Sequence, residues 1–217
     1  MGSGEDISTS IRLVNTSPDP RNLRLAAIAE DGTSIAPDNR IQLCGHCALE
    51  RDFGALFDLP EEGITVGTLE VETDGGGVIG DVIFADNNNL GYALALPLQI
   101  RTFREAVFNH VANLPGLLFT GLALFNPGGE TADITITVYG TNGLPAAETS
   151  LELDPRERIS RTLTDPGMWP GLPPQSGGYI KIISTQPIVG QQLFGDTNLR
   201  YMAAIPPTTR LEPIFEE

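Results

Sequence analysis

The chain has 217 residues and a net charge of −15 at neutral pH, from 28 acidic and 13 basic side chains. Such a field repels phosphate backbones and anionic lipid, so nucleic-acid binding is not expected. Membrane insertion is not expected either, because no apolar run approaches the roughly 20 residues that cross a bilayer. The 24 glycines and 17 prolines follow no period and predict many short strands joined by turns.

An internal repeat is the clearest feature of the chain. Six segments recur in the same order, each 109 to 111 positions later. The pairs are Ser10–Asn15 with Gly121–Asn126, Asp31–Gly32 with Asn142–Gly143, Ile41–Leu43 with Leu151–Leu153, Gly67–Val71 with Gly178–Ile182, Gly80–Asp86 with Gly190–Asp196, and Tyr92–Pro97 with Tyr201–Pro206. One module written twice explains this order. We therefore expect two tandem domains, residues 1–100 and 101–217, the second with a tail over 208–217.

In the first copy, Leu23–Ile28 alternates weakly between apolar and other residues, as a half-buried strand does. Asp31-Gly32 follows, and this dipeptide favours the type I′ turn of a hairpin, where both central residues need positive φ. The strand-like segment Ile41–Leu43 comes next and leads into Cys44-Gly45-His46-Cys47. The first copy thus predicts a series of short antiparallel strands.

Cys44-Gly45-His46-Cys47 has the spacing of a dithiol redox centre but lacks the surrounding βαβ pattern. The repeat places it opposite Asp154–Glu157, a turn between two strands. The preferred interpretation is a surface turn, with free thiols or with a Cys44–Cys47 disulfide in an exported protein. A zinc site with Cys44, His46 and Cys47 as three ligands from one loop is an alternative, and so is redox exchange.

Further along, Asp81, Asp86 and Asn88 lie in an oxygen-rich segment that could hold Ca²⁺. A plain turn rich in Asp and Asn is the preferred interpretation, and no other cofactor is expected. The chain has no Gly-x-Ser-x-Gly, no phosphate loop and no His-Glu-x-x-His, and its two histidines leave little scope for general-base chemistry. We do not expect an enzyme.

Between the copies, Arg101–Asn113 fits either a strand or a helix, because Phe103, Val107, Phe108 and Val111 also suit one helical face. In the second copy, Ile134–Tyr139 alternates cleanly with period two, and Asn142-Gly143 repeats the hairpin signal. Trp169 lies in a loop rich in Pro and Gly. A plug at the end of the domain is preferred there over a sugar-stacking residue.

Each copy therefore contains about seven short strands with turns every 8–12 residues and no helical run between them. This pattern predicts an all-β protein of two antiparallel β-sandwich domains, Ig-like or jelly-roll-like.

The second copy resembles a tandem β-sandwich repeat of large bacterial extracellular proteins. The resemblance rests on Val111-Ala112-Asn113, on Thr120–Ala132 and on Gly178–Gly190 with its Ile-x-Ser-x-x-Pro-Ile-Val ending. The first copy lacks the Val-Ala-Asn element. The sensory-rhodopsin-transducer type of small β-sandwich is similar in fold only. The resemblance implies a first strand of the second domain within residues 101–113, a location outside the cell or at its surface, and no catalytic residues. The stretch Met1–Glu5 has no features of a signal peptide.

The tail follows Pro206-Pro207 as the segment from Gln99 follows Pro97, and it contains Leu211, Ile214 and Phe215. We expect it to act as a strand for a further module, either in the same polypeptide or in another copy of the chain, which would give a head-to-tail filament. A terminus without a partner is the third alternative. The expected function is a structural, adhesive or assembly module, and the alternative function is a carbohydrate- or small-ligand-binding module.

Overall fold

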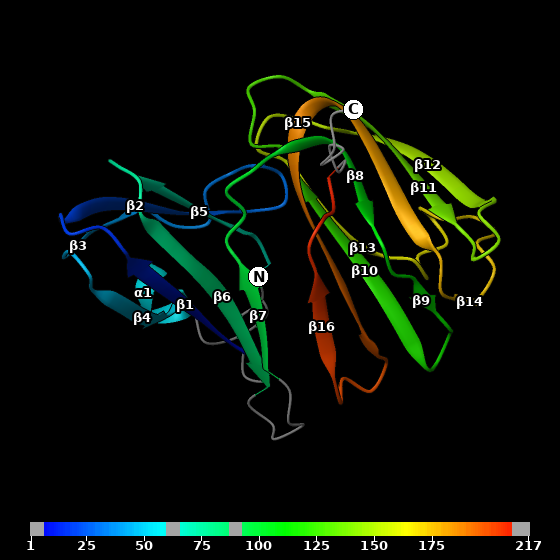
Figure 1. Ribbon diagram of the computed structural model, residues 1–217, viewed down its shortest axis with the longest axis horizontal. Coiled ribbons are helices and arrows are strands. Elements are labelled where there is room, and N and C mark those ends of the chain that lie inside the picture. Colours follow the sequence, from blue (N-terminus) through cyan, green and yellow to red (C-terminus); the bar gives the residue numbers. More distant parts are fainter. Residues whose placement is uncertain (1–6, 60–65, 87–92, 210–217) are drawn as a thin grey trace, which may run out of the picture. The chain divides into compact units, whose positions relative to one another are not determined.

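The computed structural model describes residues 7–59, 66–86 and 93–209 (Figure 1). The protein is almost entirely antiparallel β-structure, as expected, and divides into two compact units, residues 1–100 and 101–217. Unit 1 contains β1 (Ile7–Asn15), β2 (Arg21–Ile28), β3 (Asn39–Leu43), β4 (Ala48–Asp52), α1 (Phe53–Phe57), β5 (Thr68–Thr73), β6 (Val78–Asp86) and β7 (Ala93–Pro97). Unit 2 contains β8 (Phe103–Phe108), β9 (Ala112–Asn113), β10 (Leu118–Phe125), β11 (Ala132–Tyr139), β12 (Pro145–Leu153), β13 (Arg158–Thr162), β14 (Gln175–Ser176), β15 (Tyr179–Asp196) and β16 (Met202–Ile205).

Unit 1 is a sandwich of two small sheets. One has the strand order β4-β1-β6-β7 and the other β3-β2-β5. The inward residues Ile11 and Leu13 of β1 and Leu23 and Leu25 of β2 are buried in one apolar cluster. The alternation of buried and exposed side chains along both strands places this core between the sheets.

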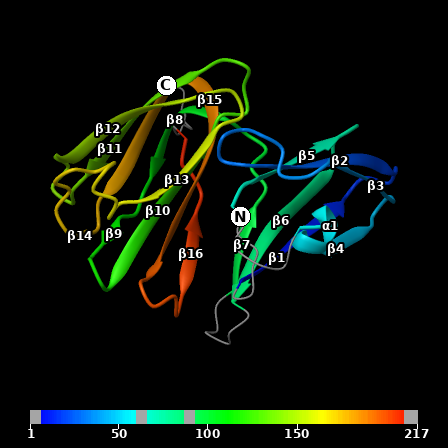
Figure 2. The same cartoon turned by 180° about the vertical axis from the view of Figure 1, so that it is seen from behind.

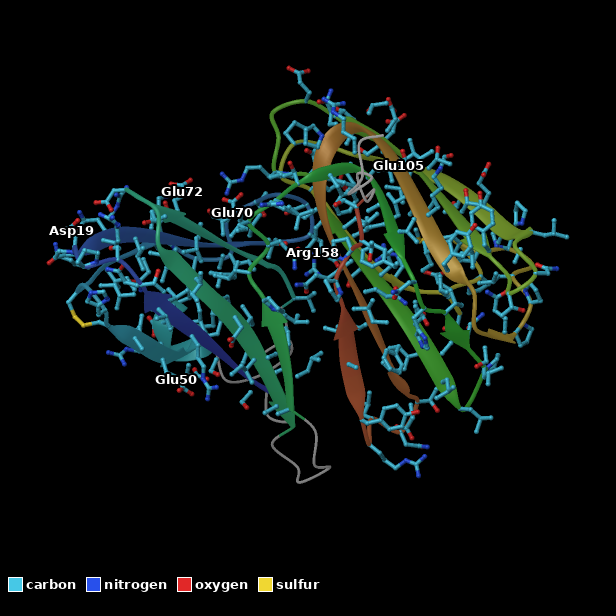
Figure 3. All side chains as sticks on the ribbon, viewed as in Figure 1. Asp19, Glu50, Glu70, Glu72, Glu105 and Arg158 are labelled. Atoms are coloured by element: carbon cyan, nitrogen blue, oxygen red, sulfur yellow. A yellow bond between two sulfur atoms is a disulfide. The ribbon has the colours of Figure 1, made fainter. Side chains whose placement is uncertain are left out.

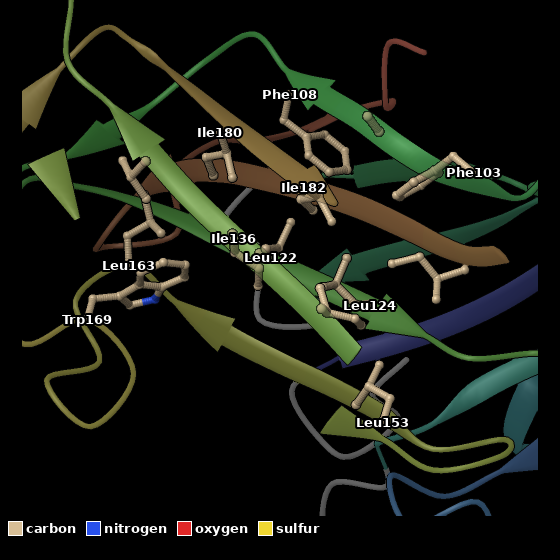
Figure 4. Packing of buried hydrophobic residues seen from close by; sticks show 14 of the residues in the cluster. Phe103, Phe108, Leu122, Leu124, Ile136, Leu153, Leu163, Trp169, Ile180 and Ile182 are labelled. Atoms are coloured by element: carbon tan, nitrogen blue, oxygen red, sulfur yellow. The ribbon is translucent and has the colours of Figure 1, made fainter. Parts of the chain in front are cut away.

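Unit 2 is built around β15, an 18-residue strand that pairs with four other strands of a seven-stranded sheet (Figure 2). Its first part, Tyr179–Ser184, pairs with β11 and β8, and its last part, Val189–Asp196, pairs with β10 and β16. The core contains Leu122 and Leu124 of β10 and Ile180 and Ile182 of β15, and Figure 4 shows these side chains converging.

The two units have the same strand order. In unit 2, β13-β10-β15-β16 corresponds to β4-β1-β6-β7, and β12-β11-β15 corresponds to β3-β2-β5. The register agrees as well. Leu23 lies opposite Thr73, and Ile134 lies opposite Ser184, with both partners 111 positions further along. β8 and β9 have no counterpart among the strands described in unit 1.

A buried asparagine is the last residue of β1 in unit 1, and another directly follows β10 in unit 2. The Nδ2 group of Asn126 donates to the carbonyl oxygens of Glu130 (2.8 Å), Leu153 (2.9 Å) and Asp154 (3.2 Å). Nδ2 of Asn15 donates to the corresponding carbonyls, those of Asp19 (2.8 Å), Leu43 (3.2 Å) and Cys44 (3.1 Å). Both side chains are fully buried. Each asparagine thus joins two loops at one end of its sandwich.

The five-residue helix α1 was not expected from the sequence. Asp52 caps it by accepting from the Ala55 amide (2.8 Å), and Phe53 and Phe57 are buried on one face in the core of unit 1. Within the described ranges, no helix has the length and apolar character needed to cross a bilayer.

Candidate strand-addition site

β8 covers one edge of β15 in unit 2. Phe108 lies opposite Ile180, Val107 opposite Lys181, and Ala106 opposite Ile182. Phe108 and Ala106 are buried in the core, and so are the residues that they face. The segment that was ambiguous between helix and strand is therefore a strand, as the resemblance implied, because its apolar side chains complete the core of unit 2.

Charges on the outer face support this pairing. The Lys181 ammonium lies 2.9 Å from a carboxylate oxygen of Glu105, across the β8–β15 pair. The hydrogen bond and the attraction of this carboxylate raise the pKa of Lys181. Both groups are partly exposed, so the pair contributes to register more than to stability.

The outer edge of β8 carries the start of the tail. The Val107 amide donates to the Thr208 carbonyl and the Thr208 amide to the Val107 carbonyl, both at 2.8 Å. Leu211, Ile214 and Phe215, the three apolar residues predicted to act in assembly, lie outside the described residues. The described start of the tail therefore pairs with β8 at Thr208.

In unit 1, the position equivalent to β15 residues 179–184 is β5. It pairs with β2 on one side and is the last strand of the sheet β3-β2-β5. No strand of the described ranges pairs with its other side. Figure 1 shows β8 alongside β15 in unit 2 and β5 next to β2 in unit 1. Edge strands of this kind can accept an added strand.

The outer face beside β5 is charged. Arg24 of β2 lies 2.6 Å from an oxygen of Asp38 and 2.7 Å from one of Glu72, and hydrogen bonds to these two carboxylates raise the pKa of Arg24. Asn22 donates to both oxygens of Asp74, and its side-chain hydrogen bond is the main cause of the lowered pKa of Asp74. Figure 3 labels Glu72 on this face. Like-charged chains meeting here would repel one another at low ionic strength.

Two open depressions lie on the described surface. One, of about 600 Å³, is lined by polar residues of β2, β3 and β5, including Arg40 and Gln42. The other, of about 720 Å³, lies over β8, β15 and the turn at Gly140–Gly143, beside the stacked rings of Tyr139 and Tyr179. Both are open surface hollows, whereas pockets for small ligands usually enclose most of the ligand surface.

Cys44 and Cys47 form a disulfide bond, which Figure 3 shows in yellow. While this bond exists, neither sulfur is a thiolate that could bind zinc with His46. The turn has its own backbone hydrogen bonds, from the Cys47 amide to the Cys44 carbonyl (3.2 Å) and from the Asn15 amide to the Cys47 carbonyl (2.9 Å). Unit 2 makes the same two bonds with Asp154, Glu157 and Asn126.

Replacing Cys44 and Cys47 together with serine is therefore expected to leave unit 1 folded but less stable. The loop that the disulfide closes is short, so the loss in the free energy of unfolding should be about 2 kcal/mol. Denaturant titrations of the variant and of the reduced wild-type chain measure it, and the two should agree. Loss of the β-sheet circular dichroism signal would show that the disulfide, and not the backbone, determines this turn.

Of the three calcium candidates, only Asp81 has its side chain among the described residues. Asp81 lies on β6 opposite Arg12 of β1, and one of its carboxylate oxygens is buried without a hydrogen-bond partner. The side chain of Asp86 and the whole of Asn88 fall outside the described residues. In the part of the chain that is described, no three His, Cys, Asp or Glu side chains are placed to share a metal ion.

Asp196 is the counterpart of Asp86 in the second copy, and its carboxylate accepts hydrogen bonds from Arg200 in the turn after β15. Burial acts to raise its pKa, but hydrogen bonds from the backbone and guanidinium of Arg200, at 2.7 and 2.6 Å, outweigh burial and lower it. The carboxylate is only 2% exposed, so Asp196 closes the turn after β15.

Trp169 is buried in the core of unit 2, with 3% of its surface exposed. Figure 4 shows its ring next to Leu163. A buried ring presents no face on which a sugar could stack.

Comparison with known proteins gives similarity at the level of the fold. No family model matches the chain, and no curated protein matches it. A structure of Thermotoga maritima 1070 is similar, with 22% identity and a TM-score of 0.42 over 48% of this chain and 92% of that one. An Anabaena sensory rhodopsin transducer is similar with 24% identity and a TM-score of 0.34 over 43% and 96%.

A β-glucuronidase of glycoside hydrolase family 2 aligns with 94% of this chain at 7% identity and a TM-score of 0.19. The alignment spans 22% of the length of that enzyme. The similarity to the sensory rhodopsin transducer is one of β-fold alone.

Proposed function

We propose that this chain is a non-enzymatic, extracellular structural protein that consists of two copies of one sandwich module and assembles head-to-tail. In this proposal the C-terminal tail of one copy adds a strand to the next copy. The observation that carries it is the contrast between the units. β8 covers the edge of β15, whereas no described strand covers the equivalent edge of β5.

Further support for duplication comes from the shared strand order and from the matching hydrogen bonds of Asn15 and Asn126. The Cys44–Cys47 disulfide supports a location outside the cytoplasm, since disulfides persist in oxidising compartments. The similarity of the second copy to repeats of bacterial extracellular proteins points the same way, and a structural or adhesive role suits that setting.

The test compares the intact chain with one ending at Thr209. The cut is placed there because Thr208 pairs with Val107 and holds the edge of β8. At about 0.15 M salt, which screens the repulsion between chains of charge −15, the intact chain is expected to form polymers that lengthen with concentration. The shortened chain should remain a monomer, with a mass slightly below the 23.2 kDa of the intact chain. Light scattering after size exclusion, with negative-stain imaging, measures both.

A matched control keeps the apolar residues of the tail and replaces Glu212, Glu216 and Glu217 with glutamine. This variant is expected to polymerise, because strand addition depends on backbone hydrogen bonds and apolar contacts. Monomers from both the intact and the shortened chain would refute self-assembly. Polymers from the shortened chain would refute the role of the tail.

A further inference from the structure

We propose that the acceptor is the outer edge of β5, and that its occupant is the tail (residues 210–217) of a second copy, antiparallel to β5 as β8 is to β15. This inference rests on the proposed function and specifies the partner and the surface. It assigns a binding role to the backbone of Leu69, Val71 and Thr73.

The first step concerns the direction of backbone groups in β5. The Asp74 amide donates to the Asn22 carbonyl at 3.3 Å, so residue 74 faces β2. Facing alternates along an antiparallel strand. Leu69, Val71 and Thr73 therefore direct their N–H and C=O groups to the opposite side, where the described strands supply no ladder.

In unit 2, the equivalent backbone groups of β15 form hydrogen bonds with an added strand, β8. Val107 bonds to Thr208 on its outer side, so its neighbours Ala106 and Phe108 face β15, opposite Ile182 and Ile180. These two isoleucines are the counterparts of Val71 and Leu69. The N–H and C=O groups of Leu69 and Val71 in β5 therefore point away from β2, just as those of Ile180 and Ile182 in β15 point toward β8.

The second step concerns apolar cover. Ile180 and Ile182, under β8, are 0% exposed. Leu69 and Val71 pack against the core of unit 1 but remain only partly buried. An added strand would remove this apolar surface from water, which is the main source of favourable free energy in such contacts.

The third step concerns the order of strands along the chain. β8 follows β7, the last strand of unit 1, after a short connection, yet it completes unit 2. The tail follows β16, which occupies the position of β7 in unit 2. By the same order, the tail would complete the next unit. In another copy, unit 1 is the unit in which no described strand pairs with the corresponding edge.

The sequence of the tail limits its register. Pro213 has no amide hydrogen, so it must lie opposite a residue that faces β2. Glu72 is such a residue, and β8 has Glu105 at the equivalent position. Placing Pro213 there sets Ile214 opposite Val71, where unit 2 has the buried Ala106.

The first experiment adds a synthetic peptide of residues 208–217 to the chain that ends at Thr209. Amide hydrogen exchange is expected to slow at Leu69, Val71 and Thr73, and not at Arg40 and Gln42 on the other edge of the same sheet. A peptide with Ile214→Asp should bind at least roughly tenfold more weakly. Protection at another edge, or no protection, would overturn the inference.

The second experiment mixes two blocked chains. The intact chain with Val71→Pro keeps its tail but loses the Val71 N–H group, which points away from β2 and would donate to the added strand. The chain ending at Thr209 keeps the β5 edge but has no tail. Neither is expected to polymerise alone, and the mixture should form 1:1 dimers. The intact chain with Gln42→Pro, an outward-facing amide on β3, should still polymerise. Its hydrogen exchange and that of Val71→Pro also report whether unit 1 remains folded.

The outcomes separate the inference from the proposed function. Tail-dependent polymers that persist in the Val71→Pro chain would leave assembly standing and refute β5 as the acceptor. Peptide protection at β5 without polymers of the intact chain would keep the acceptor and refute self-assembly. A third outcome is that the two blocked chains stay monomeric when mixed while β5 is protected in the isolated intact chain. That result would show that the tail pairs with β5 of its own chain, and it would refute a second copy as the occupant.

Discussion

Replacing Asn126 with alanine is expected to lower the free energy of unfolding of unit 2 by about 3–5 kcal/mol. The side chain is 0% exposed, and its Nδ2 group serves three carbonyls from two loops. Its Oδ1 also accepts from the Gly128 amide at 2.9 Å. Alanine would leave these buried groups without partners, and each such group costs about 1–3 kcal/mol. Denaturant titration followed by circular dichroism measures the loss.

Two further variants make this prediction specific. Asn126→Asp keeps the shape but presents oxygens to the carbonyls, so it should destabilise at least as much as alanine. Asn142→Ala removes an exposed asparagine that accepts a single bond from Leu144, and it should cost less than about 1 kcal/mol. Asn15→Ala should repeat the effect in unit 1. A loss below 1 kcal/mol for Asn126→Ala would show that water replaces the side chain at this junction.

Replacing Gly178 with alanine is expected to destabilise unit 2 by about 3 kcal/mol or more. Gly178 has φ +101°, and a Cβ there would lie 2.0 Å from the Tyr139 carbonyl oxygen. That oxygen belongs to β11, which pairs with β15 at this point. The substitution must therefore shift the start of β15, besides paying the strain of a positive φ. Thermal unfolding of the variant should show a clearly lower transition.

Gly143→Ala is the matched control. Its φ of +76° imposes similar backbone strain, but nothing lies within 4 Å of the added Cβ. The expected cost is about 1 kcal/mol. The difference between the two variants reports the steric contact with β11 together with the additional strain at φ +101°. Equal losses would show that strain alone governs both positions.

Local features of the fold followed from the sequence. Asn142-Gly143 and Asp31-Gly32 predicted turns, and the chain turns at both places. The type I′ geometry was wrong, because Gly143 and Gly32 have positive φ whereas Asn142 and Asp31 do not. The period-two pattern of Ile134–Tyr139 predicted a half-buried strand, and β11 buries alternate residues through most of its length. The repeat also paired Asn15 with Asn126, and the structure gives these two residues corresponding hydrogen bonds. These features are encoded over a few residues, through turn chemistry and side-chain alternation.

Other features depended on contacts between distant segments. Phe103–Phe108 suited a helix or a strand in isolation, and pairing with β15 decided it, because Ala106 and Phe108 complete a core formed mostly by later strands. The continuity of β15 through Pro187 and the helix α1 were likewise not visible as patterns. The sequence by itself determined the sandwich class and the turns, since their signals are local. Only the tertiary structure decided which strand edges are covered, because coverage is a relation between strands far apart in the chain.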